Sequence, residues 1–408
     1  MKTCIYCGLD KSEDEFSDEH IWPDALGGDF LSLFWRTDDV CGKCNSASGV
    51  FVDGAFIKSF FVAGERSFDA LDYLDPEKPT GVLPLSYLGV IQNIACQDGE
   101  VADFWVCAPG ANIIHFRKAS EEDTWNAYAG GDPRRQSKRS KAGRVVFALT
   151  SAEPYWLCTA LMSVKHHFAK ADKFVTNLGL PPTVQHFKEL DPADPQQAAD
   201  RRFFDEFEGK AGRGERVHGQ AVIALGADGR FLAKLALAVG YKLFGARFLA
   251  TPYGLDLRKA FREANHEKRR QIPIRGSGYL RSVNLGGVED RLRWPGGWVL
   301  LLLRQADTLS LTVQPPSGRS MVIQVTDDPD LLDTLGPEYR DGVAWLTVPQ
   351  AATAVGPIPY PEYLAHQLGQ HAHAEFGALE KLRGQRDRLP PTGIPDKPEF
   401  VEKPSAPS

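Results

Sequence analysis

The apolar positions of the first third of the chain predict a short helix followed by a small sheet. Residues 50–62 carry Phe and Val at near-helical spacing, which predicts an amphipathic helix. Beyond the Pro-rich stretch 76–84, three strand-like runs follow at residues 87–94, 104–107 and 113–116. Asp-Gly and Pro-Gly turn signals separate these runs, so we expect a small antiparallel sheet.

The rest of the chain alternates between helical and strand-like patterns. Residues 154–169 have apolar side chains spaced for one helix face, and residues 232–244 are apolar on nearly every side, as expected of a core helix. Three apolar runs with short turns between them follow at residues 298–303, 309–313 and 321–325. They predict a second antiparallel sheet.

Changes in composition divide the chain into four expected parts. They are an N-terminal unit, two α+β regions and a tail, with the boundaries 1–62, 63–212, 213–385 and 386–408. A chain of 408 residues is long enough for two or three such cores. The tail is Pro-rich and has little that could pack, which predicts disorder. We expect an α+β protein overall, with antiparallel sheets in its larger, later part.

The formal net charge of −6 gives the whole chain no attraction for nucleic acid, so a site for that partner must be a local patch. One segment has the required charge, since no acid interrupts its basic residues. They are Arg134, Arg135, Lys138, Arg139, Lys141 and Arg144. Such a segment can follow a phosphate backbone. A solvated loop explains it equally well.

The chain shows no sign of secretion or of membrane insertion. No apolar stretch of signal-peptide type precedes Cys4. No uncharged apolar run approaches the roughly 18 residues that a membrane-spanning helix needs. We therefore expect a cytoplasmic protein without a membrane partner, in a reducing compartment that keeps thiols available.

Four of the seven cysteines form two Cys-x-x-Cys pairs, which are Cys4 with Cys7 and Cys41 with Cys44. A Cys-x-x-Cys turn points both sulfurs at one ion, so two such pairs are typical of a tetrahedral structural zinc site. The alternative is two buried or redox-active pairs. We expect redox motifs to occur singly beside a βαβ pattern, and none is evident here. The other three cysteines lie among apolar residues and are expected in the core.

The loop between the two cysteine pairs contains the residues suited to catalysis. Glu19 and His20 are adjacent, so a regular strand would point them to opposite sides, whereas a strand end or bulge could turn both toward one site. A carboxylate suits a hard divalent cation, and a neutral imidazole can take a proton from water. Asn45 directly follows the last cysteine, so zinc would fix its direction.

The whole pattern resembles the HNH endonucleases, in the branch with a zinc-stapled ββα-metal fold. It reads Cys-x-x-Cys, then Glu-His-Ile-x-Pro-x-x-Leu-Gly-Gly, then Val-Cys-x-x-Cys-Asn, and covers about residues 1–62. The resemblance implies that His20 is the general base and that Glu19 is a ligand of the catalytic metal. It also implies that Asn45 takes the position where many relatives carry a second ligand.

One position departs from this family pattern. The Asn that orients the base should lie shortly before Cys41, but the chain has Thr37, Asp38 and Asp39 there. The orienting role is therefore open, and Asp39 or Asp38 is the candidate for it. Asp53, on the helix that follows, is a further candidate ligand of the catalytic ion.

The expected function is therefore metal-dependent hydrolysis of phosphodiester bonds in nucleic acid, with DNA as the expected substrate. The expected cofactors are a structural Zn²⁺ and a catalytic Mg²⁺ or another divalent ion. The missing Asn and the acidic net charge favour an alternative, a catalytically inactive, zinc-stabilised module that binds nucleic acid or protein. A third hypothesis makes the large later region an effector or sensor whose output is the nuclease.

Overall fold

The computed structural model describes residues 1–77, 82–107, 111–120, 143–149, 153–176, 188–189, 191, 193–221, 226–279 and 288–390. It is a mixed α+β structure with antiparallel sheets, which confirms the predicted fold class. Residues 391–408 of the predicted tail lie outside the described residues.

Among the residues described, no single helix has the length and apolar composition to span a membrane. The bent pair Gly42–Ile57 and Phe60–Tyr73 passes that test only when its two helices are taken together.

The N-terminal unit is two small hairpins followed by helical segments. The strands of the hairpins are β1 (Lys2–Thr3) with β2 (Asp10–Lys11), and β3 (Phe16–His20) with β4 (Arg36–Cys41). The helical segments are α1 (Gly42–Ser48), a π-helical turn (Gly49–Asp53), α2 (Gly54–Ile57) and α3 (Phe60–Asp69). The predicted helix 50–62 is thus interrupted, because Ser59 has an extended backbone.

A seven-stranded sheet forms the middle of the chain. Its strands lie in the order β10 (Lys188–Glu189), β9 (Lys173–Thr176), β8 (Arg144–Leu149), β7 (Ala111–Lys118), β6 (Glu100–Cys107), β5 (Leu85–Ile91) and β11 (Gly219–Gln220). The pairs from β11 to β8 are antiparallel, and β5, β6 and β7 among them are the three strands of the predicted small sheet. The pairs β8–β9 and β9–β10 are parallel.

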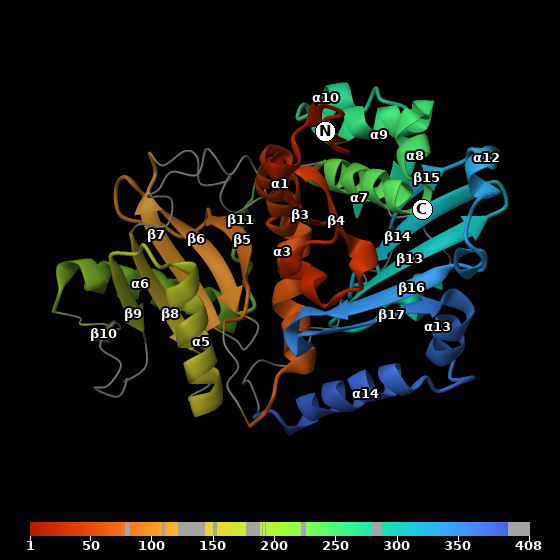
Figure 1. The fold of residues 1–408 in the computed structure, drawn as a ribbon. Helices are drawn as coiled ribbons and strands as arrows, with labels where there is room; N and C mark the ends of the chain where they lie inside the picture. The colour runs from red at the N-terminus through yellow and green to blue at the C-terminus, as the bar shows by residue number, and fades with distance from the viewer. Residues whose placement is uncertain are drawn as a thin grey trace, which may run out of the picture.

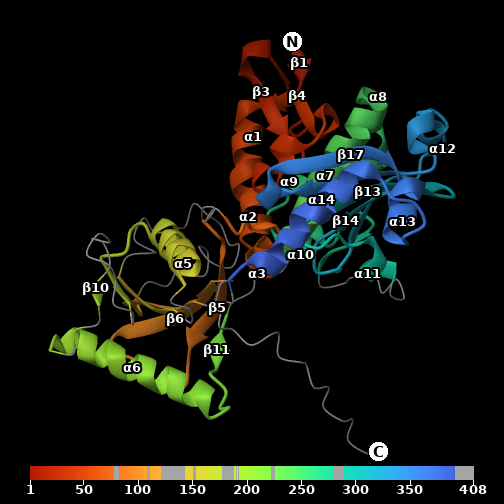
Figure 2. The same ribbon diagram turned by 90° about the horizontal axis from the view of Figure 1, so that it is seen from below.

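Helices α5 (Pro154–His167) and α6 (Pro195–Gly212) cover opposite faces of this sheet (Figure 2). Successive strand residues point to opposite faces. Accordingly, Ile113 belongs to the core under α5, and its neighbour Ile114 belongs to the core under α6. This sheet and its two helices form a lobe beside the rest of the molecule (Figures 1 and 2).

A six-stranded antiparallel sheet forms the last part of the chain. Its strands lie in the order β12 (Gly276–Ser277), β15 (Met321–Thr326), β14 (Thr308–Gln314), β13 (Trp298–Gln305), β16 (Val343–Val348) and β17 (Thr353–Pro359). The helices around it are α7 (Ala227–Phe244), α8 (Ala246–Ala250), α9 (Pro252–Arg262), α10 (His266–Arg269), α11 (Val288–Leu292), α12 (Pro329–Leu332), α13 (Tyr360–Gln367) and α14 (Ala374–Arg383).

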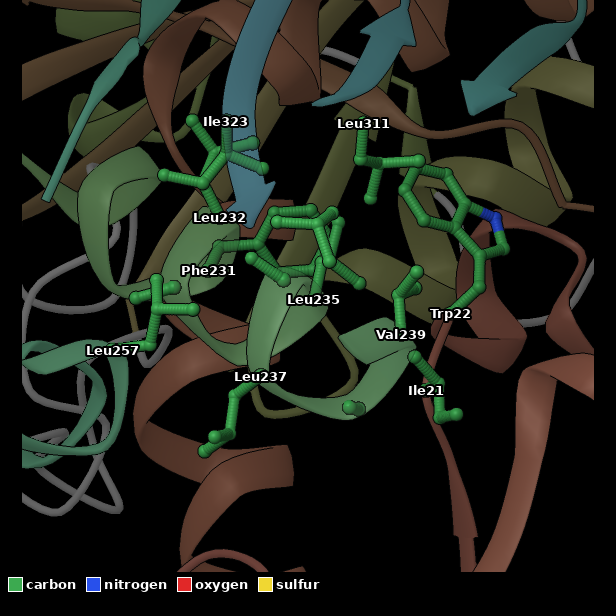
Figure 3. Packing of buried hydrophobic residues seen from close by; sticks show 14 of the residues in the cluster. Ile21, Trp22, Phe231, Leu232, Leu235, Leu237, Val239, Leu257, Leu311 and Ile323 are labelled. Atoms are coloured by element: carbon green, nitrogen blue, oxygen red, sulfur yellow. The ribbon is translucent and has the colours of Figure 1, made fainter. Parts of the chain in front are cut away.

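Helix α7 is the core helix that the sequence predicts, and it joins the N-terminal unit to the six-stranded sheet. Its residues 231–239 are buried without exception. Phe231 stacks on Phe56 of α2 with ring centroids 3.9 Å apart, and Trp22 contacts Phe231 on one side and Trp298 of β13 on the other. Figure 3 shows Trp22, Phe231 and other buried residues of this core from close by. The N-terminal unit therefore shares one hydrophobic core with a segment about 170 residues later.

Glu65 of α3 is a partly buried carboxyl at a contact with the later part of the chain. Ser317 Oγ donates a hydrogen bond of 2.6 Å to Glu65 Oε1, and Oε2 has no hydrogen-bond partner among the described residues. Burial raises the pKa of Glu65 to about 8. An unfolded glutamate has a pKa of about 4.3. Between these values unfolding releases a proton, so the free energy of unfolding falls as the pH rises.

We predict that the Glu65→Gln variant lacks this pH dependence. Between pH 5 and 8, wild type should lose stability relative to the variant by up to about 1.4 kcal/mol per pH unit. Above pH 8 the difference should stop growing, because Glu65 is then ionised in both states. Urea unfolding at a series of pH values measures the difference. Glu375→Gln, at an exposed position, is the control, and parallel pH curves for Glu65→Gln and wild type would contradict the prediction.

Candidate active site and metal centre

The four cysteines of the two Cys-x-x-Cys pairs come together in space. Cys4 and Cys7 lie between β1 and β2, and Cys41 and Cys44 lie at the junction of β4 and α1. All four Sγ atoms are within 4.8 Å of one another. Zn–S bonds of about 2.3 Å place tetrahedral sulfurs roughly 3.8 Å apart. The cluster therefore fits a zinc ion.

The electrostatics of this cluster favour a thiolate at Cys4, the form of cysteine that binds a metal ion. A hydrogen bond from the Cys44 thiol and others from backbone N–H groups lower the pKa of Cys4 to about 4. Two arginines of α9 lie beside the cluster and would offset thiolate charge. Arg258 Nε donates to the Ile5 carbonyl at 3.1 Å, and Arg262 Nη1 donates to the Cys7 carbonyl at 3.5 Å.

The Glu19–His20 pair lies at the end of β3, where the hairpin with β4 has a register shift between Ser17 and Glu19. The shift does not bring the two side chains to one face. The Glu19 side chain is only 3% exposed, whereas that of His20 is 22% exposed. The alternative that a bulge turns both toward one open site is therefore wrong for this hairpin.

His20 lies between two carboxylates that the sequence analysis did not identify. Its Nδ1 is 3.2 Å from Asp24 Oδ1, and its Nε2 is 3.0 Å from Asp29 Oδ1. Nε2 makes no hydrogen bond with correct geometry among the described residues. Burial raises the pKa of Asp24, while both aspartate side chains remain about half exposed. The three side chains are close enough to share a metal ion.

Two glycines allow the loop after β3 to fold back toward His20. Gly27 has φ +89°, and a Cβ there would lie 1.9 Å from Thr347 Oγ1 of β16. A Cβ on Gly28 would lie 2.0 Å from the Trp22 carbonyl oxygen. The double Gly of the sequence pattern is therefore needed both for backbone conformation and for close packing. Gly27 and Gly28 thereby bring the turns that contain Asp24 and Asp29 toward His20.

Arg36 supplies positive charge beside His20. It is the cross-strand partner of His20 in the β3–β4 hairpin. Its Nη2 donates to Asp29 Oδ1 at 2.9 Å, and its Nη1 is 3.7 Å from Asp18 Oδ2. The side chain is 30% exposed, so this cation can reach a ligand that approaches His20.

Glu19 and Asp53, two of the three predicted ligands of the catalytic ion, are bound to a lysine. Lys234 of α7 is fully buried, and its Nζ is 2.9 Å from Glu19 Oε1 and 2.7 Å from Asp53 Oδ2. Tyr6 Oη also donates to Glu19 Oε1, at 3.0 Å. Burial alone would lower the pKa of Lys234, but the charges of Asp53 and Glu19 outweigh it and raise that pKa.

The predicted ligand set of Glu19, Asn45 and Asp53 therefore needs correction. Mg²⁺ binds carboxylate oxygen at 2.0–2.1 Å, and the Lys234 ammonium occupies the space between the two carboxylates. Asn45 uses its Nδ2 to donate to Ser17 Oγ at 3.0 Å and to the Asp18 carbonyl at 2.7 Å. Asn45 thus fastens α1 to β3, and the three side chains do not form an open cation site.

The orienting role considered for Asp39 or Asp38 also finds no support in the geometry. Both carboxylates form ion pairs with Lys2, at 2.9 Å for Asp39 and 3.1 Å for Asp38. Thr37 Oγ1 donates to Asp39 as well. Neither aspartate is among the partners of His20, because β4 turns them toward the first hairpin. The carboxylate at Nδ1 of His20 is Asp24.

Of the six basic residues in the segment 134–144, Arg144 lies among the described residues. Arg134, Arg135, Lys138, Arg139 and Lys141 lie outside the described residues. Arg144 is in β8, where its guanidinium donates to Glu100 Oε1 at 2.6 Å and to Asp200 Oδ2 at 2.8 Å. With its donors committed to two carboxylates and its side chain 12% exposed, Arg144 does not fit the predicted phosphate contact.

A second basic surface lies beside the cysteine cluster. A pocket of about 330 Å³ there is lined in part by Lys11, Lys43, Arg230 and Arg262. These residues are far apart in the sequence, so no run of basic residues reveals the surface. The sequence gives one weak indication of Lys234, because it is the one charged residue within the apolar stretch 231–240. For Asp24 and Asp29 the sequence gives no indication beyond their position in a turn.

Comparison with known proteins assigns the N-terminal part of the chain. The family model described as HNH endonuclease matches residues 4–61, about a seventh of the chain. No curated protein and no solved structure gives a significant match. The matched range contains the four-cysteine cluster and the β3–β4 hairpin with His20. Residues 4–61 are therefore an HNH endonuclease domain, with a cysteine cluster compatible with zinc.

Proposed function

We propose that the HNH domain hydrolyses phosphodiester bonds in nucleic acid, with DNA as the expected substrate and His20 as the general base. The observation that carries this proposal is the position of His20 at the end of β3, partly open to solvent, with a carboxylate at each ring nitrogen. A positioned imidazole accepts a proton from an attacking water and contributes on the order of 10² to 10⁴-fold in rate.

The neighbours of His20 have distinct roles in this mechanism. Asp24, at Nδ1, holds the ring and stabilises the imidazolium that forms when Nε2 takes the proton. Asp29 covers Nε2, but its side chain is 55% exposed and can rotate to admit water. Arg36, which binds Asp29, is then free to contact the negative charge on the phosphate.

HNH nucleases use divalent metals, and two exposed carboxylates beside the base fit such an ion. Asp24 and Asp29 would be its oxygen ligands, and Mg²⁺ or another divalent ion would stabilise the charge that develops on the phosphate. Glu19 and Asp53 do not fit this role, since Lys234 binds both.

Residues at some distance from His20 would hold the substrate. The basic pocket beside the cysteine cluster offers contacts for a phosphate backbone. The basic segment 134–144 remains a further proposed contact through its residues other than Arg144. The proposed structural zinc adds no chemistry and holds β4 and α1 in register.

One observation favours a second function, a zinc-stabilised module that binds nucleic acid or protein without cleaving it. The two buried carboxylates of the HNH domain share the ammonium group of one lysine of the same chain. If the divalent ion needs those carboxylates, the domain is inactive. Plasmid nicking in Mg²⁺ and Mn²⁺ separates the two functions, since only the nuclease cleaves.

We predict that His20→Ala reduces plasmid nicking by at least 10²-fold and leaves zinc content and melting temperature close to wild type. The His20 side chain is partly exposed, and it is absent from the buried hydrophobic core. His218→Ala is the matched control, because His218 is exposed in the middle lobe. Cleavage by His20→Ala at the wild-type rate would remove His20 from the mechanism.

We predict that Asp24→Asn slows nicking about tenfold or more, because an amide holds the ring but stabilises the imidazolium less. Asp14→Asn, on another turn of the same domain, should leave the nicking rate unchanged. Nicking by Asp24→Asn at the wild-type rate would rule out the role of the Asp24 charge.

We predict that Cys41→Ser loses bound zinc and unfolds the HNH domain, because three thiolates bind zinc much more weakly than four. Metal analysis and limited proteolysis of the full chain measure the two effects. Cys158→Ser, in α5 of the middle lobe, should retain zinc. A folded, zinc-free Cys41→Ser protein would refute the structural role of the ion.

A further inference from the structure

We propose that the Lys234 ammonium is a permanent, built-in cation of the Glu19–Asp53 carboxylate pair, and that this pair binds a divalent ion only when the lysine charge is removed. Which cation occupies this buried site is independent of the proposed hydrolysis. Lys234 lies outside the matched range 4–61.

The ammonium has all its hydrogen-bonding capacity in use. A lysine carries three N–H donors, and Lys234 has three acceptors, Glu19 Oε1, Asp53 Oδ2 and the His20 carbonyl oxygen, at 2.9, 2.7 and 3.1 Å. The lysine side chain is 0% exposed. A buried charge persists only when it is paired and hydrogen-bonded in this way.

The site carries more negative than positive charge. Two carboxylates face one ammonium, and Asp53 Oδ1 is buried without a hydrogen-bond partner among the described residues. The Glu19 side chain is 3% exposed and that of Asp53 is 12% exposed, so water can compensate little. Without the lysine charge, two carboxylates around one point are a ligand set for a divalent ion.

Lys234 cannot leave this site by rotating its side chain. It lies in the middle of α7, between Ala233 and Leu235, which are also fully buried. Figure 1 shows α7 beside the β3–β4 hairpin, and the six-stranded sheet shares the same core. Withdrawal of the ammonium would require α7 to separate from the HNH domain. The occupancy is therefore a property of the fold and not a switch.

Lys234 has a second effect, which makes it a positioning residue for His20. Its hydrogen bond to the His20 carbonyl oxygen fixes the end of β3 at the residue that carries the imidazole. The Lys234 ammonium of α7 thus contacts β3 through Glu19 and His20, and it contacts the helical segment that ends at Asp53. The buried Glu19–Lys234–Asp53 cluster therefore joins the HNH domain to the rest of the chain.

A Mn²⁺ titration of the zinc-loaded full-length protein tests the proposal, with free Mn²⁺ followed by electron paramagnetic resonance. The proteins are wild type, Glu19→Gln, Lys234→Met and the double variant Lys234→Met with Glu19→Gln. Gln keeps the oxygen that accepts from Tyr6 and Lys234, so Glu19→Gln should fold.

We expect Glu19→Gln to change the Mn²⁺ affinity of the protein less than twofold, whether or not wild type binds Mn²⁺ elsewhere. Lys234→Met should gain a Mn²⁺ site, and the double variant should lose it. A tenfold or greater loss of Mn²⁺ affinity in Glu19→Gln would overturn the proposal, as would a folded Lys234→Met protein without an added site. If Lys234→Met does not fold, the comparison of wild type with Glu19→Gln still shows whether the carboxylate pair binds Mn²⁺ while Lys234 is present.

Asp29→Asn separates this result from the proposed function. Loss of Mn²⁺ binding in Asp29→Asn, with no effect of Glu19→Gln, places the ion at the His20 cluster and leaves the Lys234 proposal intact. Failure of the nuclease proposal would instead appear as an absence of nicking, with the four titrations unchanged.

Discussion

Helix α7 must be covered on nearly every side, and this constraint organises the structure around it. Its residues 231–239 are all buried, and an apolar helix of this kind is stable only inside a core. The six-stranded sheet covers one side, and the HNH domain supplies Ile21, Trp22 and Phe56 for the other. A domain of about 60 residues buries little of its own surface, so each partner completes the core of the other.

This arrangement decides which carboxylates of the HNH domain face solvent. Because α7 brings an ammonium group into the domain, Glu19 and Asp53 are paired with it in the interior. The carboxylates that remain open are Asp24 and Asp29, on the loop held by the double Gly. The chemistry near His20 therefore depends on loop residues on the open side of the hairpin.

Local patterns predict local structure in this chain. The Cys-x-x-Cys spacing predicts the thiol cluster, and the apolar patterns predict three strands of each large sheet and the helix α7. Contacts between distant residues are not predicted in this way. Arg144 looked like a phosphate contact within a basic run, but Glu100 and Asp200, 44 and 56 residues away, bind its guanidinium. Charge counted along the chain does not reveal such neutralisation.

The sequence by itself determined the identity of the HNH domain and the thiol spacing suited to zinc. These features depend on residues within one short segment, where spacing fixes geometry. Only the tertiary structure decided that Lys234 fills the Glu19–Asp53 pair and that Asp24, not Asp39, accompanies His20. Both outcomes depend on how a helix and a turn pack against the hairpin, and packing brings together groups that no local pattern relates.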